Sequence, residues 1–331
     1  VSRPVTAPHH RPGGGFRNPW ANAAAPAFGG FLKWVLVQRI TRPRPADPPH
    51  SAFHRLEPKF AVPRAAPDRL LVTWVGHSSF LLQVGGLNVL TDPMWSSRAS
   101  PVGFAGPRRW VAPGIDFATL PPIDFVLLSH NHYDHLDDRT VRRLAAREPR
   151  ATWLVPLGLG RFVRARGARD VWEHDWWQET PIGPALVACT PAQHFSSRGL
   201  RDRGATLWCG WAVRTNPHRV FFAGDTGYHP EFGRIAERYG PFHLALLPIG
   251  GYEPRWFMQP VHMNPEEAVR AFRDLGGGAH GTVMIPMHWG TFKLTDEAMD
   301  EPPIRARVAW REAGLAPEQF WMLAHGETRA L

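Results

Sequence analysis

Three histidines and an aspartate lie within six residues of the sequence, at His130, His132, Asp134 and His135. The apolar segment 125–128 directly precedes them and is typical of a buried strand. Because residues two apart in an extended chain share a face, His130 and His132 can bind one metal ion together, and the next two ligands can face a second ion. Imidazole and carboxylate groups suit Zn²⁺ in a site that keeps an open position. The segment therefore predicts a metal centre.

Three further candidate ligands follow apolar strands elsewhere in the chain. His194 comes after ALVAC, Asp225 after VFFAG and His288 after VMIPM. One histidine at a strand end is more often structural, but three such sites beside the histidine cluster favour a centre with two metal ions. A single carboxylate such as Asp225 can lie between two cations, which would keep it ionised despite burial.

The elements that must position these residues can be predicted from the surrounding pattern. Segment 69–93 predicts three strands, with a Gly-Gly hairpin signal at 85–86. Segment 137–149 predicts a helix with an acidic start, and segment 264–276 predicts another with Asn264 as its N-cap. Apolar strands alternate with these helices along the rest of the chain. This order predicts an α/β fold with mixed sheets.

The first 65 residues differ in composition from the rest. Residues 1–65 are rich in Pro, Gly, Ala and Arg and predict a mostly irregular arm, ahead of a hydrolase domain over 66–331. The apolar segment 28–40 within the arm fits an interfacial helix or, as the favoured reading, a segment packed on the protein body. Cys189 and Cys209 lie in strand-like stretches and are expected to be buried thiols.

The net charge of +9 favours anionic partners. No dense basic tract carries interleaved aromatic residues, so nucleic-acid binding is not expected. The sequence contains no apolar run of about 18 residues or more, and its first residues lack the apolar core of a secretory signal. The expected location is the cytoplasm, with peripheral attachment to a membrane.

The motifs together resemble the N-acyl-phosphatidylethanolamine-hydrolysing phospholipase D family of the metallo-β-lactamase superfamily. The resemblance covers residues 70–331 and extends weakly to FRNPW at 16–20. It rests on the ligand order HxHxDH, His, Asp, His and on the segments TDPMWSSRASPVGFAGPRR, LPPIDFVLLSHNHYDHLD, VPLGL, TPAQH, FFAGDTGY, YEPRWFM, PEEAV, HWGTF and HGE.

The resemblance implies an αβ/βα sandwich, in which two mixed β-sheets flanked by helices hold two zinc ions between them. One zinc ion is expected on His130, His132 and His194, the other on Asp134, His135 and His288, with Asp225 bridging the two. Asp225 and Asp134 are the carboxylates expected to take part in catalysis.

Other positions are assigned less directly by the resemblance. Asp92 matches an acid that lies behind the metal ligands, although a turn residue before proline fits its context nearly as well. His262 and Tyr133 are candidates for substrate contact, with a helix-entry role as the alternative for His262. Val261 and Asn264 depart from the family's Gln and Asp, so contacts to the head group can differ here. The histidine of the GHSSF segment matches a superfamily motif but receives no role.

The implied reaction is hydrolysis of N-acyl-phosphatidylethanolamine, or a related phospholipid, to phosphatidic acid and N-acylethanolamine by a metal-bridging hydroxide. A lactonase or another small-ester metallohydrolase on the same fold is the first alternative. A lipid-binding module without turnover is the second. The expected partners are the phospholipid substrate and an anionic membrane surface, contacted through the anchor candidates Phe31, Leu32, Trp34 and Leu36. The oligomeric state stays open, with a homodimer as one alternative.

Overall fold

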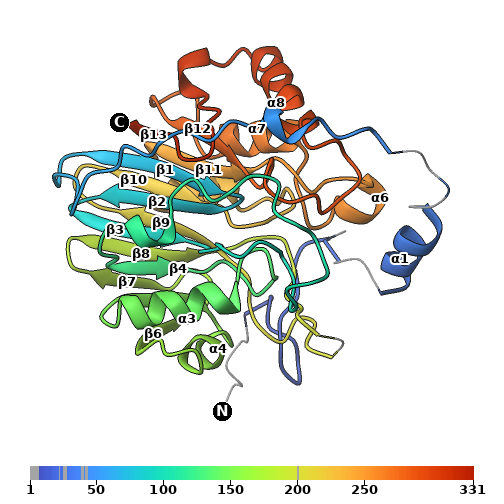
Figure 1. The fold of residues 1–331 in the computed structure, drawn as a ribbon, viewed down its shortest axis with the longest axis horizontal. Coiled ribbons are helices and arrows are strands. Elements are labelled where there is room, and N and C mark those ends of the chain that lie inside the picture. The colour runs from blue at the N-terminus through green and yellow to red at the C-terminus, as the bar shows by residue number, and fades with distance from the viewer. Residues whose placement is uncertain (1–6, 22, 25–27, 39–40, 42–43, 200) are drawn as a thin grey trace.

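The computed structural model describes residues 7–331, apart from 22, 25–27, 39–40, 42–43 and 200. Two β-sheets stack face to face, and helices lie outside them (Figure 1). The strand order is β13-β1-β2-β3-β4-β5-β6 in the seven-stranded sheet and β12-β11-β10-β9-β8-β7 in the six-stranded sheet. Each sheet contains parallel and antiparallel pairs. The predicted αβ/βα sandwich with two mixed sheets is confirmed.

The first sheet consists of β1 (Leu70–Gly76), β2 (Ser79–Val84), β3 (Leu87–Thr91), β4 (Phe125–Leu127), β5 (Thr152–Pro156), β6 (Asp170–His174) and β13 (Thr328–Ala330). The second consists of β7 (Glu179–Ile182), β8 (Ala185–Thr190), β9 (Gly210–Arg214), β10 (Arg219–Phe222), β11 (Leu244–Pro248) and β12 (Val283–Met287). The helices are α1 (Phe28–Lys33), α3 (Asp138–Arg147), α4 (Gly160–Arg164), α5 (Phe232–Tyr239), α6 (Arg255–Met258), α7 (Pro265–Asp274) and α8 (Glu301–Glu312). Shorter helical turns are η1 (Trp34–Gln38), η2 (His50–Ala52), η3 (Phe117–Thr119) and η4 (Pro317–Gln319).

Alternation along the strands divides the core into layers. In β4, Phe125 and Leu127 join the apolar cluster between the sheets, whereas Val126 joins the cluster on the outer face. That outer cluster includes Val141 and Leu144 of α3, so α3 covers the seven-stranded sheet. Helices α5, α7 and α8 contribute to the larger cluster on the side of the six-stranded sheet.

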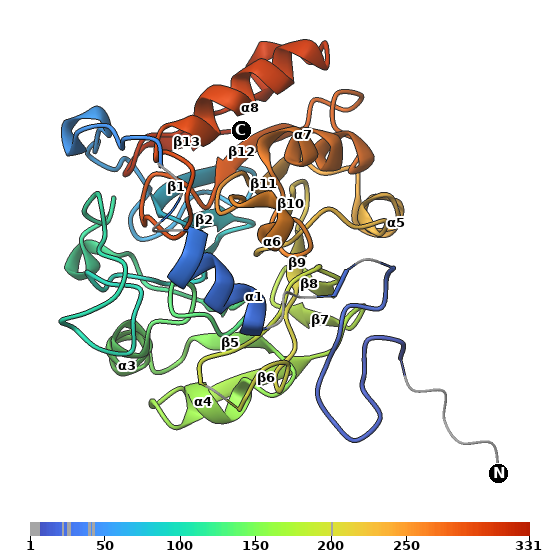
Figure 2. The same cartoon turned by 90° about the vertical axis from the view of Figure 1, so that its right-hand side faces the viewer.

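Strand direction brings the chemically important residues to one end of the sandwich. In the first sheet β1 and β3 are each antiparallel to β2, and β3 is parallel to β4. In the second sheet β8 and β10 are each antiparallel to β9, and β10, β11 and β12 are parallel. The segments that follow β1, β3, β4, β8, β10 and β12 therefore leave the sheets at the same end, and Figure 2 shows α1 and α6 lying there as well.

The local predictions for the hairpin and the helix starts are confirmed. Gly85 and Gly86 join β2 to β3 with φ of 61° and 75°, the left-handed values that a two-residue turn between such strands requires. The Asn264 side chain accepts a hydrogen bond from the Glu267 N–H at the start of α7, and Glu267 returns a bond to the backbone of Asn264, which completes a capping box.

The segment that contains α1 and η1 packs on the body of the protein. Trp34 is 4% exposed, lies among Phe257, Met258 and Val261, and donates a hydrogen bond of 2.5 Å from its indole to Asp296. Trp34 is therefore not available as a membrane anchor, contrary to expectation, because its side chain faces inward. Leu32 and Leu36 are 39% and 61% exposed, and the side chain of Phe31 lies outside the described part of the chain.

Two further expectations can be compared with the structure. Cys189 and Cys209 are buried free thiols, as predicted. Among the described residues, no helix is both long and apolar enough to cross a bilayer.

Candidate metal centre

All seven predicted ligands meet at the shared end of the two sheets. Four of them follow β4 within the segment 130–135, and the others follow β8, β10 and β12. The ligand atoms of six of them form two neighbouring groups: His130, His132 and His194 in one, and Asp134, His135 and His288, joined by His77, in the other.

The first group consists of three imidazoles that face one another. His132 Nδ1 lies 2.9 Å from His130 Nε2 and 3.1 Å from His194 Nε2. The remaining nitrogen of His194 donates to the carbonyl of Val261 at 2.8 Å, and that of His130 donates to the hydroxyl of Ser129 at 2.8 Å. These outer hydrogen bonds fix the tautomers and direct the Nε2 lone pairs of His130 and His194 into the group.

The second group surrounds one carboxylate oxygen. Asp134 Oδ2 lies 3.4 Å from His135 Nε2 and 3.5 Å from His288 Nε2. His288 Nδ1 donates to the carbonyl of Gly250 at 3.3 Å, so its Nε2 is the nitrogen directed inward. His288 adopts a φ of 62°, an uncommon conformation outside glycine that is required to turn the ring from the end of β12 into the site.

Asp225 lies between the two groups. Its Oδ2 is 2.9 Å from His135 Nε2 and 3.1 Å from His288 Nε2 in one group. The same oxygen is 3.8 Å from His130 Nε2 and 4.0 Å from His194 Nε2 in the other. One carboxylate oxygen thus faces four nitrogens, which is the arrangement expected of a ligand shared by two cations.

Several polar atoms at the centre lack hydrogen-bond partners and are suited to binding a metal ion. His135 Nε2, His288 Nε2 and Asp225 Oδ1 are buried and, within the described residues, make no hydrogen bond of good geometry. Buried polar atoms of this kind are rare in proteins and need a partner. Imidazole nitrogens and carboxylate oxygens are the donors that Zn²⁺ and related cations accept, so the residues fit a metal centre.

The protonation states of the first group also suit metal binding. Burial lowers the pKa of His130 well below its usual value, that of His132 to about 3 and that of His194 to about 4. These three rings are therefore neutral near pH 7 and keep a lone pair for a cation.

In the second group the negative charges of the carboxylates determine the direction of the histidine pKa shifts. Burial would lower the pKa of His288, but the charges of Asp225 and Asp134 raise it to about 9. Burial would raise the pKa of Asp225, but His135 and His288 hold it well below its usual value. Without a cation, then, protons on the histidines balance the buried carboxylates.

Asp92 lies behind the ligands, where its predicted role requires it. The side chain is fully buried, and its Oδ2 accepts a hydrogen bond of 2.7 Å from His135 Nδ1. The backbone N–H and the hydroxyl of Ser129 donate to Asp92 as well. Asp92 thereby orients His135 directly and His130 through Ser129. A turn residue before proline would need only its backbone hydrogen bonds. The contact between the Asp92 carboxylate and the candidate ligand His135 therefore favours the ligand-orienting role.

His77 belongs to the same site, although the sequence reading gave it no role. Its Nε2 lies 2.9 Å from Asp134 Oδ2, and its carbonyl accepts the backbone N–H of His288 at 3.2 Å. A φ of 56° at His77 turns the ring toward Asp134 at the end of β1. The GHSSF segment was the only local signal for this contact, because Asp134 lies 57 residues away.

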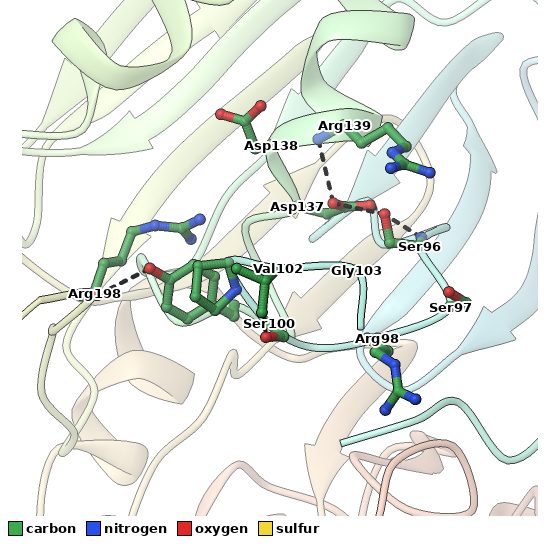
Figure 3. Close-up of a pocket in the computed structure, with 12 residues that line it drawn as sticks. Ser96, Ser97, Arg98, Ser100, Val102, Gly103, Asp137, Asp138, Arg139 and Arg198 are labelled. Carbon is green, nitrogen blue, oxygen red and sulfur yellow. Dashed lines mark hydrogen bonds between the residues drawn. The ribbon is translucent and has the colours of Figure 1, made fainter. Parts of the chain in front are cut away.

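The two candidate substrate residues occupy different places. His262 is half-buried at the centre, with its ring 5.0 Å from His194 and 5.1 Å from His288, and its Nδ1 has no hydrogen-bond partner among the described residues. Tyr133 instead lines a pocket of about 210 Å³, where its hydroxyl donates to the carbonyl of Arg198 and its ring lies 3.9 Å from the guanidinium of Arg198. Figure 3 shows this pocket with Arg198 and Asp137 among its lining residues.

The positions that depart from the family pattern have structural duties. Asn264 caps α7, and Val261 packs against Trp34 while its carbonyl accepts the hydrogen bond from His194. These structural contacts account for both residues without any contact between their side chains and a substrate head group.

Comparison with known proteins identifies the family. A model described as a β-lactamase superfamily domain matches residues 87–289. N-acyl-phosphatidylethanolamine-hydrolyzing phospholipase D 1 of Caenorhabditis elegans is 42% identical over 244 residues, covering 70% of this chain and 67% of that protein. A UPF0173 metal-dependent hydrolase of Aeropyrum pernix is 31% identical over 272 residues, covering 78% and 96%.

A solved structure supports the fold. The metallo hydrolase Igni18 of Ignicoccus hospitalis superposes with a TM-score of 0.59 at 24% identity, covering 80% of this chain and 98% of that one. The chain is a metal-dependent hydrolase of the metallo-β-lactamase superfamily and belongs to the family that includes the N-acyl-phosphatidylethanolamine-hydrolysing phospholipases D.

Proposed function

We propose that this protein is a phosphodiesterase of the phospholipase D type with two zinc ions, which hydrolyses N-acyl-phosphatidylethanolamine or a related phospholipid. The position of Asp225 Oδ2 between two groups of imidazoles is the observation that carries the proposal. The identity to the phospholipase D of C. elegans supports the choice of a phosphodiester over a lactone.

In this proposal the residues have distinct metal-binding and positioning roles. His130, His132 and His194 would hold one zinc ion, Asp134, His135 and His288 the other, with Asp225 shared. When bound, such a pair of ions activates water as a nucleophile and offsets charge on the phosphoryl oxygens. Asp92 fixes the ring of His135 through the 2.7 Å bond to Nδ1, and His77 holds Asp134 at 2.9 Å. His262 contributes a half-buried imidazole to the wall, within reach of a substrate held at the centre.

The proposed substrate lies in a bilayer, so the protein must reach a membrane surface. Leu32 and Leu36 of the α1–η1 segment and Trp256 of α6 are exposed, and Lys33 of α1 lies over the Trp256 ring at 5.5 Å. An apolar surface with a basic neighbour suits shallow insertion among anionic head groups. This surface lies at the same end of the sandwich as the metal centre (Figure 2).

Product analysis tests the proposed reaction. Purified protein loaded with Zn²⁺ is incubated separately with N-acyl-phosphatidylethanolamine in mixed micelles, with a lactone and with bis-p-nitrophenyl phosphate. Release of phosphatidic acid and N-acylethanolamine, detected by mass spectrometry, is the expected result. Consumption of the lactone alone would assign the alternative small-ester hydrolase, and consumption of no substrate would refute a hydrolytic role of this kind.

A further inference from the structure

Glu297 is a buried carboxylate outside the set of candidate ligands. It lies between β12 and α8 and is 6% exposed. Its Oε1 accepts hydrogen bonds from the Gly251 N–H at 2.6 Å and from the Thr295 hydroxyl at 2.7 Å, and its Oε2 accepts one from the Glu253 N–H at 3.1 Å. Its partners among the described residues are thus all donors, which is what the ionised form of a carboxylate requires.

The Glu297 carboxylate is held by hydrogen bonds and forms no ion pair with a basic side chain in the described part of the chain. Lys293, four residues away, donates to Asp47 at 2.7 Å and to the backbone carbonyl of Glu297 instead. Burial raises the pKa of Glu297, and the hydrogen bonds that it accepts oppose that rise, with the bond from Thr295 first among them. The negative charge therefore acts mainly on the groups that donate to it.

The peptide group between Gly250 and Gly251 joins Glu297 to a candidate metal ligand. Its N–H donates to the Glu297 carboxylate, and its carbonyl accepts the 3.3 Å hydrogen bond from His288 Nδ1. Because the N–H and the carbonyl of a trans peptide point in opposite directions, the carboxylate and the imidazole lie on opposite sides of one peptide. A charged acceptor on the N–H polarises the peptide and makes its carbonyl oxygen a stronger acceptor.

Close packing fixes the position of this peptide. A Cβ added at Gly250 would lie 2.2 Å from the carbonyl oxygen of His288. Gly251 has a φ of 82°, and a Cβ there would lie 3.1 Å from His288 Cε1 and 3.3 Å from His262 Nδ1. Glycine at both positions therefore allows the peptide to approach the ring this closely. Glu297 also lines a cavity of only about 20 Å³, room for roughly one water molecule, so a substrate group does not fit against the carboxylate.

The first group of imidazoles provides a comparison within the same site. His194 Nδ1 also donates to a backbone carbonyl, that of Val261, at 2.8 Å. The N–H of that peptide, however, donates to the carbonyl of Met258 at 2.8 Å, which is a neutral acceptor. A carboxylate behind the peptide therefore distinguishes His288 from His194.

We propose that Glu297 is a positioning residue for the metal centre, which acts through the Gly250–Gly251 peptide to hold His288 as a ligand of the second metal ion. This inference rests on the two-ion centre of the proposed function. A stronger acceptor for the Nδ1–H of His288 fixes the tautomer and makes Nε2 a better donor to a cation. Loss of the Glu297 charge is therefore expected to weaken metal binding by the second group alone.

A double-mutant cycle tests this inference. Glu297→Gln removes the charge and keeps an oxygen that can accept the Gly251 N–H, and Zn²⁺ affinity is measured by competition with a chromophoric chelator. In the wild-type background the ion that His288 binds should be held about tenfold or more less tightly. In the His288→Ala background Glu297→Gln should leave the affinity for the remaining ion unchanged, because the residue through which Glu297 acts is absent.

Glu301→Gln is the matched control. The Glu301 carboxylate accepts the Tyr252 hydroxyl at 2.6 Å, next to the same peptide, but accepts no hydrogen bond from Gly251. This variant should bind Zn²⁺ like the wild type. An unchanged affinity in Glu297→Gln, or the same loss in the presence and absence of His288, would overturn the proposed role.

A measurement on the wild-type protein does not depend on the folding of any variant. The amide resonances of Gly251 and Glu253 are followed in ¹⁵N-labelled protein during a Zn²⁺ titration. Both N–H groups donate to Glu297, but only the Gly251 peptide carries the carbonyl that His288 contacts. The Gly251 proton should resonate downfield of the Glu253 proton, as its shorter charge-assisted bond requires, and should shift further as Zn²⁺ binds. A Gly251 resonance that Zn²⁺ does not move would overturn the coupling.

These measurements separate the inference from the proposed reaction, because none of them needs turnover. The expected loss of Zn²⁺ affinity in Glu297→Gln supports the positioning role even if no phospholipid is hydrolysed. Equal Zn²⁺ affinity of Glu297→Gln and the wild type refutes that role even if the phospholipid is hydrolysed.

Discussion

At the scale of single residues, Asp225 is the group on which both halves of the centre depend. Its Oδ2 contacts nitrogens of both groups, whereas each histidine belongs to one. Replacing this carboxylate removes a negative charge from the middle of the site, the charge that does most to raise the pKa of His135 and of His288. Its loss is therefore expected to affect occupancy by both of the proposed ions.

Asp225→Asn and His132→Ala should each abolish turnover while the fold is retained. Both changes remove a candidate ligand, and the proposed pair of ions that would activate water would be lost with it. Activity below a tenth of the wild-type value, an effect of about 1.4 kcal/mol or more on the barrier, is the expected result. Turnover is measured alongside metal content and circular dichroism. His218→Gln is the matched control, since this buried histidine lies in the turn between β9 and β10. Retention of more than a tenth of the activity at full metal occupancy would contradict the assignment.

Replacing Asp92 should have a smaller effect than replacing a ligand, because Asp92 contacts the candidate ligand His135 and is not itself a candidate ligand. Asp92→Asn removes the charge that accepts the proton of His135 Nδ1 and disturbs the bond to the Ser129 hydroxyl. The affinity for Zn²⁺ is expected to fall by about 10- to 100-fold. Competition with a chromophoric chelator measures it. An affinity equal to that of the wild type would show that Asp92 only completes its turn.

Metal uptake should release protons. The carboxylates raise the pKa of His288 to about 9, so this ring is protonated near pH 7 in the metal-free protein. A cation must displace that proton, and apparent affinity should rise by about tenfold per pH unit for each proton displaced until the pH passes that pKa. Calorimetric titration in two buffers of different ionisation enthalpy counts the protons. Zero protons released at pH 7 would mean that His288 is already neutral.

At the scale of elements, the sequence predicted the parts whose signals are local. The segment 130–135 carries four candidate ligands in one turn, and the Asn264 capping box, like the Gly-Gly hairpin, is written in adjacent residues. The three remaining ligands were identifiable because each ends an apolar strand, and the strand directions then bring them together.

Contacts that join distant segments were not predictable in the same way. His77 contacts Asp134, which is 57 residues away in the sequence, and it adopts a left-handed backbone conformation that no neighbouring residue predicts. The arm was expected to be irregular, yet Trp20 stacks on Trp176 and on His229, contacts that no pattern within the arm encodes. Trp34 reads as a surface anchor by composition and is buried because α6 supplies an apolar surface for it.

The contacts of His9 and His10 in the arm with Asp175 can be tested at the same scale. Asp175→Asn removes the charged acceptor of two histidine hydrogen bonds, each worth about 1.5–3 kcal/mol. The arm should open more often, and trypsin should cut after Arg17 about tenfold faster while the domain stays intact. Asp170→Asn is the control, since that carboxylate accepts hydrogen bonds from Thr152 and Trp172 instead. Cleavage rates equal in the two variants would show that stacking alone holds the arm.

At the scale of the whole molecule, charge and shape act together on membrane approach. The net charge of +9 attracts anionic head groups over distances longer than any single contact. The exposed apolar side chains of Leu32, Leu36 and Trp256 are few, so they cannot provide lasting attachment by themselves. The expected result is loose, salt-dependent binding.

Flotation with vesicles tests this expectation. Vesicles that contain phosphatidylglycerol should carry the protein upward at low salt and release much of it at high salt, because each basic residue near the surface contributes about 1 kcal/mol that screening removes. Leu32→Asp with Leu36→Asp should weaken flotation further. Ile304→Asp on α8 is the matched control, being 54% exposed on a helix that packs against α7. Point variants are preferable to deleting residues 1–45, because that deletion would also remove the contacts of Phe16 and Asn18 with the body. Equal flotation with neutral and anionic vesicles would contradict the electrostatic contribution, and full binding of the double leucine variant would contradict the apolar one.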